Sequence, residues 1–265
     1  MTSIPSAAPA PLGAATALPP APTPSVPQLW DRAFALARAH YAPLVTISAL
    51  SLLLTAPVSI AGAVYGTDGM LPGMAGLLSV LYEWIIGAVA YGAMIVVVAE
   101  AYHGGAPSVA DAARASVRRT VPLVLTLLAM MLVMVLGVLL LIVPGVLAFV
   151  RLFAVQAAVV LEGAGVREAF RRSIALSRGY GWRILGTAGV ATVVYLAMTA
   201  TLVLALQPLV KSQALATVLS SVALTLVTPV IVSLATVLYL DIRARREGYD
   251  IELAVRALAS APPSA

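Results

Sequence analysis

Six long apolar runs are the feature of this sequence that most limits its fold. They cover residues 44–64, 74–99, 121–143, 146–161, 184–206 and 214–240. The hydrocarbon core of a bilayer is about 30 Å thick and takes about 20 residues of helix to cross, which most of these runs supply. The sequence therefore predicts an all-α fold, a polytopic membrane bundle of six transmembrane helices, with short amphipathic cytosolic helices between them.

The composition excludes a water-soluble globule and several kinds of chemistry. Hydrophobic residues make up 61% of the chain and charged residues only 10%, so most of the surface must face lipid. The chain contains no cysteine, which rules out disulfides, thiolate metal sites and cysteine nucleophiles. The net charge of +5 comes from arginines that flank apolar runs. We therefore expect an anionic lipid surface as the partner, and no nucleic acid.

Composition also divides the chain into three parts. Residues 1–28 are rich in proline and alanine and carry no charge, which predicts a disordered tail without the features of a signal peptide. Residues 29–253 form the predicted six-span membrane domain, and residues 254–265 a flexible C-terminal tail. An amphipathic segment that precedes each pair of spans suggests a threefold internal repeat, although alanine-rich helices align easily by chance.

The distribution of basic residues predicts how the chain crosses the membrane. The segments before the first span and after the second, fourth and sixth hold almost all of the lysines and arginines; Arg151 and Lys211 are the exceptions. Positively charged loops stay in the cytosol. The N-terminus and the C-terminus are therefore both predicted to be cytosolic, and the loops that contain Asp68 and Lys211 to face the other side.

Two charged residues fall inside predicted spans, Glu83 in the second and Arg151 in the fourth. A charge in a span costs about 2.5 to 3.5 kcal/mol on insertion scales, so such a residue usually faces a partner or water. Counted along the helices from the same side of the membrane, the two lie at similar depths. We therefore predict an intramembrane ion pair between them, with a substrate or proton pathway as the alternative.

The cytosolic segments contain two further candidate sites. The segment after the fourth span is amphipathic and basic, so its arginines are predicted to contact anionic lipid head groups. The tail after the sixth span places opposite charges four residues apart, a spacing that favours ion pairs on a helix. The predicted lipid contacts are Arg167, Arg171, Arg172, Arg178 and Arg183, and the predicted tail ion pairs are Asp241 with Arg245 and Arg243 with Glu247.

No catalytic constellation is visible in the sequence. The only histidines, His40 and His103, fall at the edges of different spans without clustered carboxylates. Metal-dependent hydrolysis of a phosphodiester would need carboxylate ligands and histidines placed together for acid–base work. We therefore expect no catalytic residues, no metal and no cofactor.

Several motifs recur together in a way that resembles a known family. They are residues 142–145 (IVPG), 160–163 (VLEG), 171–173 (RRS), 178–179 (RG), 182–183 (WR) and 239–250 (YLDIRARREGYD). With 30–34 (WDRAF) and 100–104 (EAYHG), they resemble the membrane domain of bacterial glycerophosphoryl diester phosphodiesterases. The resemblance implies an uncharacterised six-helix protein of the bacterial cytoplasmic (inner) membrane. The family is named after members fused to a phosphodiesterase domain, for which this chain has no room.

Two classes of function follow from these observations. The first is a membrane scaffold or accessory component without its own catalytic site, which works with a membrane-protein partner or as a homodimer. The second is a transporter or channel for a small or lipid-like solute, with Glu83 and Arg151 along its path. A membrane enzyme acting on lipid is a poorer third. Buried polar groups around a cavity would favour the transporter, whereas a fully packed bundle would favour the scaffold.

Overall fold

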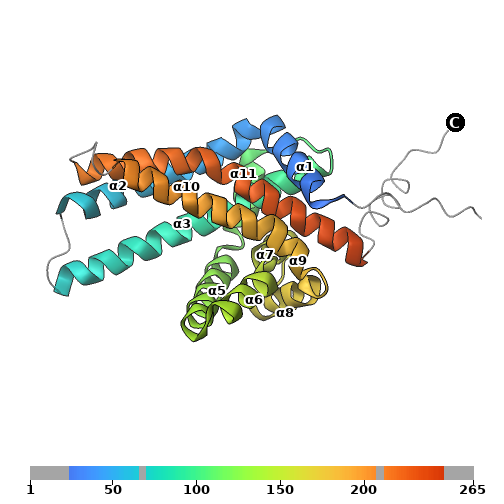
Figure 1. Cartoon of the computed structure of the whole chain (residues 1–265). Coiled ribbons are helices and arrows are strands. Elements are labelled where there is room, and N and C mark those ends of the chain that lie inside the picture. The colour runs from blue at the N-terminus through green and yellow to red at the C-terminus, as the bar shows by residue number, and fades with distance from the viewer. Residues whose placement is uncertain (1–23, 66–69, 207–211, 248–265) are drawn as a thin grey trace, which may run out of the picture.

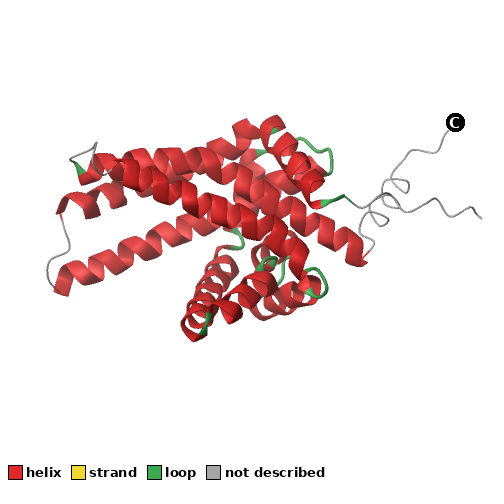
Figure 2. Cartoon of the chain, viewed as in Figure 1, coloured by secondary structure: helices red, strands yellow, loops and turns green. Residues whose placement is uncertain are grey.

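The structure, a computed structural model, describes residues 24–65, 70–206 and 212–247. These residues form helices joined by short loops (Figures 1 and 2). In chain order the helices are α1 (Val26–Ala39), α2 (Tyr41–Tyr65), α3 (Met70–Tyr102), α4 (Val109–Val117), α5 (Thr120–Leu140), α6 (Ile142–Leu152), α7 (Val155–Leu161), α8 (Val166–Ser177), α9 (Gly181–Ile184), the π-helical segment η1 (Leu185–Gly189), α10 (Val190–Leu206) and α11 (Gln213–Glu247).

Six segments of the described chain are long and apolar enough to cross a membrane: Tyr41–Ala61, Gly76–Tyr102, Thr120–Gly137, Val143–Leu161, Gly181–Thr201 and Val218–Glu247. Short amphipathic helices lie between or before them, α1, α4 and α8 among them. The predicted fold class is confirmed. Many large apolar side chains of the spans are exposed, such as Leu53, Leu139 and Val193. Exposed apolar surface on this scale belongs against lipid.

The first helix starts earlier than the sequence predicted. Helix α1 begins at Val26, after Ser25, whose backbone N–H donates to Oε1 of Gln28 at 2.8 Å. This contact and Pro27 in the first turn favour helix initiation inside a segment that was assigned to a disordered tail. The rest of that tail and the predicted C-terminal tail, 254–265, lie outside the described residues.

The turn between the third and fourth spans lies before the Pro-Gly pair. Helix α5 ends at Leu140, Leu141 is extended, and α6 starts at Ile142, so Pro144 and Gly145 lie in the first turn of α6. Proline is tolerated there because the first helical N–H groups have no intrahelical partner. A Cβ on Gly137 would lie 3.0 Å from the Cα of Gly145. Two glycines thus allow the helices of this hairpin to approach closely.

The tightly packed core lies at one end of the bundle. Buried apolar residues concentrate in 93–99 of α3 and 232–242 of α11, and α1 packs a stripe of Leu29, Ala33 and Ala37 against this region. The four helices α2, α3, α10 and α11 run along the long axis of the molecule, and the α5–α6 hairpin is inclined to them (Figure 1). The ends of α3 and α11 that carry charged residues lie at this packed end.

Candidate functional site

A cluster of charged residues at the packed end ties the loop after the fourth span to the last helix. Arg172 of α8 donates to both carboxylate oxygens of Glu162, from Nε at 2.6 Å and from Nη2 at 3.0 Å. Arg172 also binds both oxygens of Glu247, with Nη2 2.7 Å from Oε2. Tyr239 donates to Glu162 at 2.5 Å, and Arg243 lies 3.3 Å from Glu247 and 3.6 Å from Glu162. We call these five residues the Glu162 cluster.

The neighbours of Arg172 hold its charge in place. Hydrogen bonds from its guanidinium to Glu162 and Glu247 raise the pKa of Arg172 above its ordinary value. Bidentate contacts of this kind add geometric specificity as well as energy. Because Arg172 comes from α8 and Glu247 from the end of α11, the cluster fixes the position of α8 on the last helix.

The next residue, Ser173, stabilises a break in the fourth span. Helix α6 ends at Leu152 and α7 starts at Val155, which leaves backbone groups between them without helical partners. The Ser173 hydroxyl donates to the carbonyl of Arg151 at 2.7 Å and accepts from the N–H of Ala154 at 3.1 Å. The fully buried Ser173 side chain thus bridges the two sides of the break.

A second charged cluster lies around Asp241, which is 5% exposed. Arg183 of α9 and Arg245 of α11 each donate from Nε to its Oδ2 at 2.9 Å. Both arginines also donate to the carbonyl of Pro24, at 2.6 Å and 2.9 Å respectively. This cluster connects the start of the fifth span, the end of the sixth and the segment before α1. Both predicted tail ion pairs, Asp241 with Arg245 and Arg243 with Glu247, are therefore present.

The predicted set of lipid-binding arginines needs a correction. Arg172 and Arg183 have only 28% and 16% of their side chains exposed and are held in ion pairs. Arg167, Arg171 and Arg178 are exposed, and Arg171 lies 3.8 Å from Glu168 in an exposed pair. The apolar side of α8 is covered by α5, α6 and α7 and not by lipid. Sequence spacing could not separate the two groups, because the partners of the buried arginines lie on other helices.

Glu83 and Arg151 do not form the predicted ion pair. Glu83 of α3 accepts a hydrogen bond of 2.5 Å from the hydroxyl of Ser59 in α2, and no ion pair within 4.0 Å joins it to any described residue. Arg151 lies where α6 meets α8, since its carbonyl binds Ser173. The prediction was wrong because the inclined hairpin brings Arg151 toward the packed end, whereas Glu83 lies 19 residues before Tyr102, about 28 Å along α3.

The carboxylate of Glu83 lies at a cavity of about 310 Å³ between α2, α3 and α11. Seven serine and threonine residues line this space, four on α2 and three on α11, and Tyr91 of α3 adds a phenol. We call it the hydroxyl cavity. The seven are Ser48, Ser51, Thr55, Ser59, Ser221, Thr225 and Thr228. Their spacing of three or four residues within each helix places them on one face. This pattern was the signal in the sequence that could have revealed the site.

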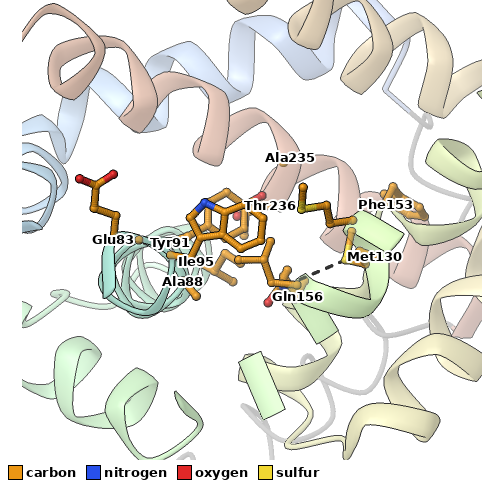
Figure 3. Close-up of a pocket in the computed structure, with 14 residues that line it drawn as sticks. Glu83, Ala88, Tyr91, Ile95, Met130, Phe153, Gln156, Ala235 and Thr236 are labelled. Atoms are coloured by element: carbon orange, nitrogen blue, oxygen red, sulfur yellow. Dashed lines mark hydrogen bonds between the residues drawn. The ribbon is translucent and has the colours of Figure 1, made fainter. Parts of the chain in front are cut away.

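A second, mainly apolar cavity of about 490 Å³ adjoins the first (Figure 3). It lies between α3, α5, α7 and α11, and we call it the apolar cavity. Aromatic and methionine side chains form much of its wall, Trp84, Phe153 and Met130 among them. Gln156 faces it from α7; its Oε1 is buried and has no hydrogen-bond partner. Figure 3 shows Gln156 and Glu83 on opposite sides of α3.

Three residues on one face of α3 line both cavities. Glu83, Gly87 and Tyr91, each four residues apart, line the hydroxyl cavity and the apolar cavity alike. A Cβ placed on Gly87 would meet nothing within 4 Å. The missing side chain of Gly87 therefore leaves open space where the two cavities adjoin, close to the Glu83 carboxylate.

Metal-binding groups do not gather in the described part of the chain. No group of three histidine, cysteine or acidic side chains there could hold a metal ion. His40 follows α1 and His103 follows α3. The pKa of His103 is lowered, mainly because the ring is partly buried and also because Arg243 is positively charged. Neither histidine lines the two cavities.

The fold and these cavities define the class of the protein, a polytopic helical membrane protein with a polar cavity inside its spans. A family model described as a domain of unknown function (DUF7847) matches residues 75–242, more than half of the chain. The protein belongs to this family. The matched range runs from α3 to Ile242 and includes Glu83, Glu162 and Asp241. Searches of curated proteins and of solved structures give no match to this chain.

Proposed function

We propose that this protein binds a lipid-like, amphiphilic solute inside the membrane and serves as a carrier for it. The observation in favour is the pair of adjoining cavities, one mainly apolar and one lined by hydroxyls and a carboxylate. Their volumes, about 490 and 310 Å³, are in the range of small-molecule sites. An amphiphile could occupy both cavities at once, with its chain among Trp84, Phe153 and Met130 and its head near Glu83.

The charged end supports a proposal for location and orientation. We place the protein in the bacterial cytoplasmic membrane with both termini in the cytosol, since residues 109–119, helix α8 and the end of α11, each with three arginines, gather on one side. The cavities then lie nearer the opposite side of the bilayer, because most of the α3 residues that line them precede the packed segment 93–99.

A second candidate function is the scaffold or accessory role that the resemblance to the glycerophosphodiester phosphodiesterase membrane domain implies. The specific observation in its favour is the packed end, where the two charged clusters hold α8, α9 and α11 together and leave Arg167, Arg171 and Arg178 exposed. These arginines would bind anionic lipid head groups or a membrane-protein partner. The sequence signal for a homodimer, Gly62 and Gly66 four residues apart at the end of the first predicted span, falls on positions whose surroundings the structure does not describe.

Binding of an amphiphile can be tested with Trp84, which lines the apolar cavity. The chain has three tryptophans, so Trp30→Phe with Trp182→Phe leaves Trp84 as the only one. In detergent or nanodiscs, ω-bromododecanol should quench Trp84 fluorescence saturably, because bromine quenches indole at contact distance. Unbrominated dodecanol should reverse the quenching.

The control is a tryptophan that faces lipid. Leu196 of α10 is 59% exposed, and Leu196→Trp in a variant without the other tryptophans reports partition into the bilayer. Gly87→Leu should abolish the saturable quenching of Trp84, whereas Gly87→Ala should leave it nearly unchanged. Quenching of Trp84 that rises linearly with probe and matches that of Leu196→Trp would overturn the proposal.

A further inference from the structure

The Glu83 carboxylate is the one acidic group among the described residues that line the two cavities, and no described cation pairs with it. Its hydrogen bond from Ser59 accounts for one of several acceptor positions on a carboxylate. An ionised group inside a span usually pairs with an opposite charge or faces water. Without such a partner the carboxylate has to be protonated, hydrated or paired with a bound cation, and the hydroxyl cavity that it lines offers room for the cation.

The hydroxyl cavity presents mostly acceptors. Each serine or threonine hydroxyl has one proton to donate and two lone pairs. Thr55, Thr225 and Thr228 donate their protons to carbonyls of their own helices, at 3.0, 2.8 and 2.8 Å. Ser48 donates to Sδ of Met94 at 3.3 Å, and Ser59 donates to Glu83. With their protons committed, these five hydroxyl oxygens can only accept from a ligand.

A proline adds to this excess of acceptors. Pro229 of α11 has no N–H, so the carbonyl of Thr225, four residues earlier, loses its helical donor. Thr225 lines the hydroxyl cavity. In membrane proteins, carbonyls released from a helical ladder are tolerated where they line a cavity, and they commonly coordinate cations there.

We propose that the hydroxyl cavity binds a primary ammonium group, paired with Glu83 and surrounded by hydroxyl acceptors, as the head of an amphiphile whose chain occupies the apolar cavity. An ammonium has one positive charge and three donors with no acceptor, which complements this lining. A quaternary ammonium has no donor and is bound by aromatic cages, whereas Tyr91 is the only aromatic residue among the described residues that line this cavity. The open space at Gly87 would let the chain pass beside α3.

This inference rests on the proposed function and gives the chemistry of the head group. A free alkali ion would satisfy the same acceptors, so the experiment has to distinguish the two sources of positive charge. In the Trp84-only protein, quenching by ω-bromododecylamine is compared with quenching by ω-bromododecanol and by the N,N,N-trimethyl derivative of the amine. The measurements are made at neutral pH, where an alkylamine is protonated.

The amine should bind about 10-fold more tightly than the alcohol, because its hydrogen bonds involve a charge. Glu83→Gln should reduce the affinity for the amine to about that for the alcohol, and saturable binding of the alcohol by this variant would show that it is folded. The trimethyl derivative should not bind more tightly than the alcohol. The preference for the amine should be equal in sodium chloride and in choline chloride of the same concentration.

Each other outcome is decisive. Equal, saturable binding of the amine and the alcohol would overturn the ammonium site and leave the proposed function standing. Equal binding of the amine and its trimethyl derivative would show that net charge alone is recognised and would overturn the role of the donors. Loss of the preference in sodium chloride alone would assign the site to a free alkali ion. If no probe quenched Trp84 saturably, the proposed function would itself fail.

Discussion

At the scale of single residues, neighbours in the sequence have opposite environments. Arg171 and Arg172 are adjacent and chemically identical, yet 81% of the Arg171 side chain is exposed, against 28% for Arg172. Exposed ion pairs contribute about 0 to 1 kcal/mol to stability. Removal of one partner from a buried hydrogen-bonded pair costs more, because it leaves the other group unsatisfied.

This contrast gives a matched pair of variants. Arg172→Gln should destabilise the protein by about 1 to 3 kcal/mol, since Glu162 and Glu247 lose their shared cation in a mostly buried setting. Arg171→Gln should change stability by less than about 0.5 kcal/mol. Thermal unfolding of the two variants in the same detergent measures the difference. Equal melting temperatures would show that the Glu162 cluster contributes no stability.

At the scale of elements, α8 has two sides with different partners. Ala169, Ser173 and Leu176 are buried against neighbouring helices, and Ser173 holds the break between α6 and α7. Arg167 and Arg171 lie on the exposed side. An amphipathic helix of this kind was predicted to lie on the membrane, but its apolar side is already covered by the protein. The residues of this segment that remain available to lipid head groups are the exposed arginines, Arg167 and Arg171 on α8 and Arg178 just after it.

We therefore expect anionic lipid to act through Arg167, Arg171 and Arg178. Added phosphatidylglycerol should stabilise the wild-type protein in detergent more than phosphatidylcholine does, and the triple change of these arginines to Gln should remove this difference. Each arginine near a lipid surface contributes about 1 kcal/mol. Higher salt should weaken the effect by screening. Glu168→Gln, which removes a neighbouring negative charge, should strengthen it; stabilisation that is indifferent to lipid charge would contradict the proposal.

At the scale of the whole molecule, the bundle has a packed end and a hollow end. The packed end contains the buried residues of α3 and α11 and both charged clusters. The hydroxyl cavity lies mainly in the other part of the same helices, where it is lined by serines and threonines. Well-packed interiors resist deformation, whereas regions with fewer buried contacts open more readily. This division suits a protein that opens at one end and stays rigid at the other.

The proposed orientation can be checked on the whole molecule because the chain has no cysteine. Single cysteines at Ser108, Arg178, Leu141 and Lys211 are treated with a membrane-impermeant maleimide on intact spheroplasts. Lys211→Cys and Leu141→Cys should be labelled, because the proposed orientation puts both connections on the outer side. Ser108→Cys and Arg178→Cys should react only after permeabilisation. Labelling of Arg178→Cys in intact spheroplasts would reverse the orientation.

The sequence by itself determined the features that depend on local pattern and on the bilayer. Six runs of sufficient length predicted the six spans, because backbone hydrogen bonds within lipid must be satisfied inside each helix. The i, i+4 spacing from Asp241 to Glu247 predicted two ion pairs that the structure contains, because such pairs form within a single helix.

Only the tertiary structure decided which residues from different helices meet. The partners of Arg172 and Arg183 lie 58 to 75 residues away on α11, and Glu162 lies 10 residues before Arg172, so helical periodicity could not reveal the clusters. Depth counted along the chain paired Glu83 with Arg151, but the inclination of the hairpin separated them. The same inclination opens the apolar cavity beside α3. Distances across a bundle depend on the crossing angles between its helices, and the residue pattern within a single helix does not predict those angles.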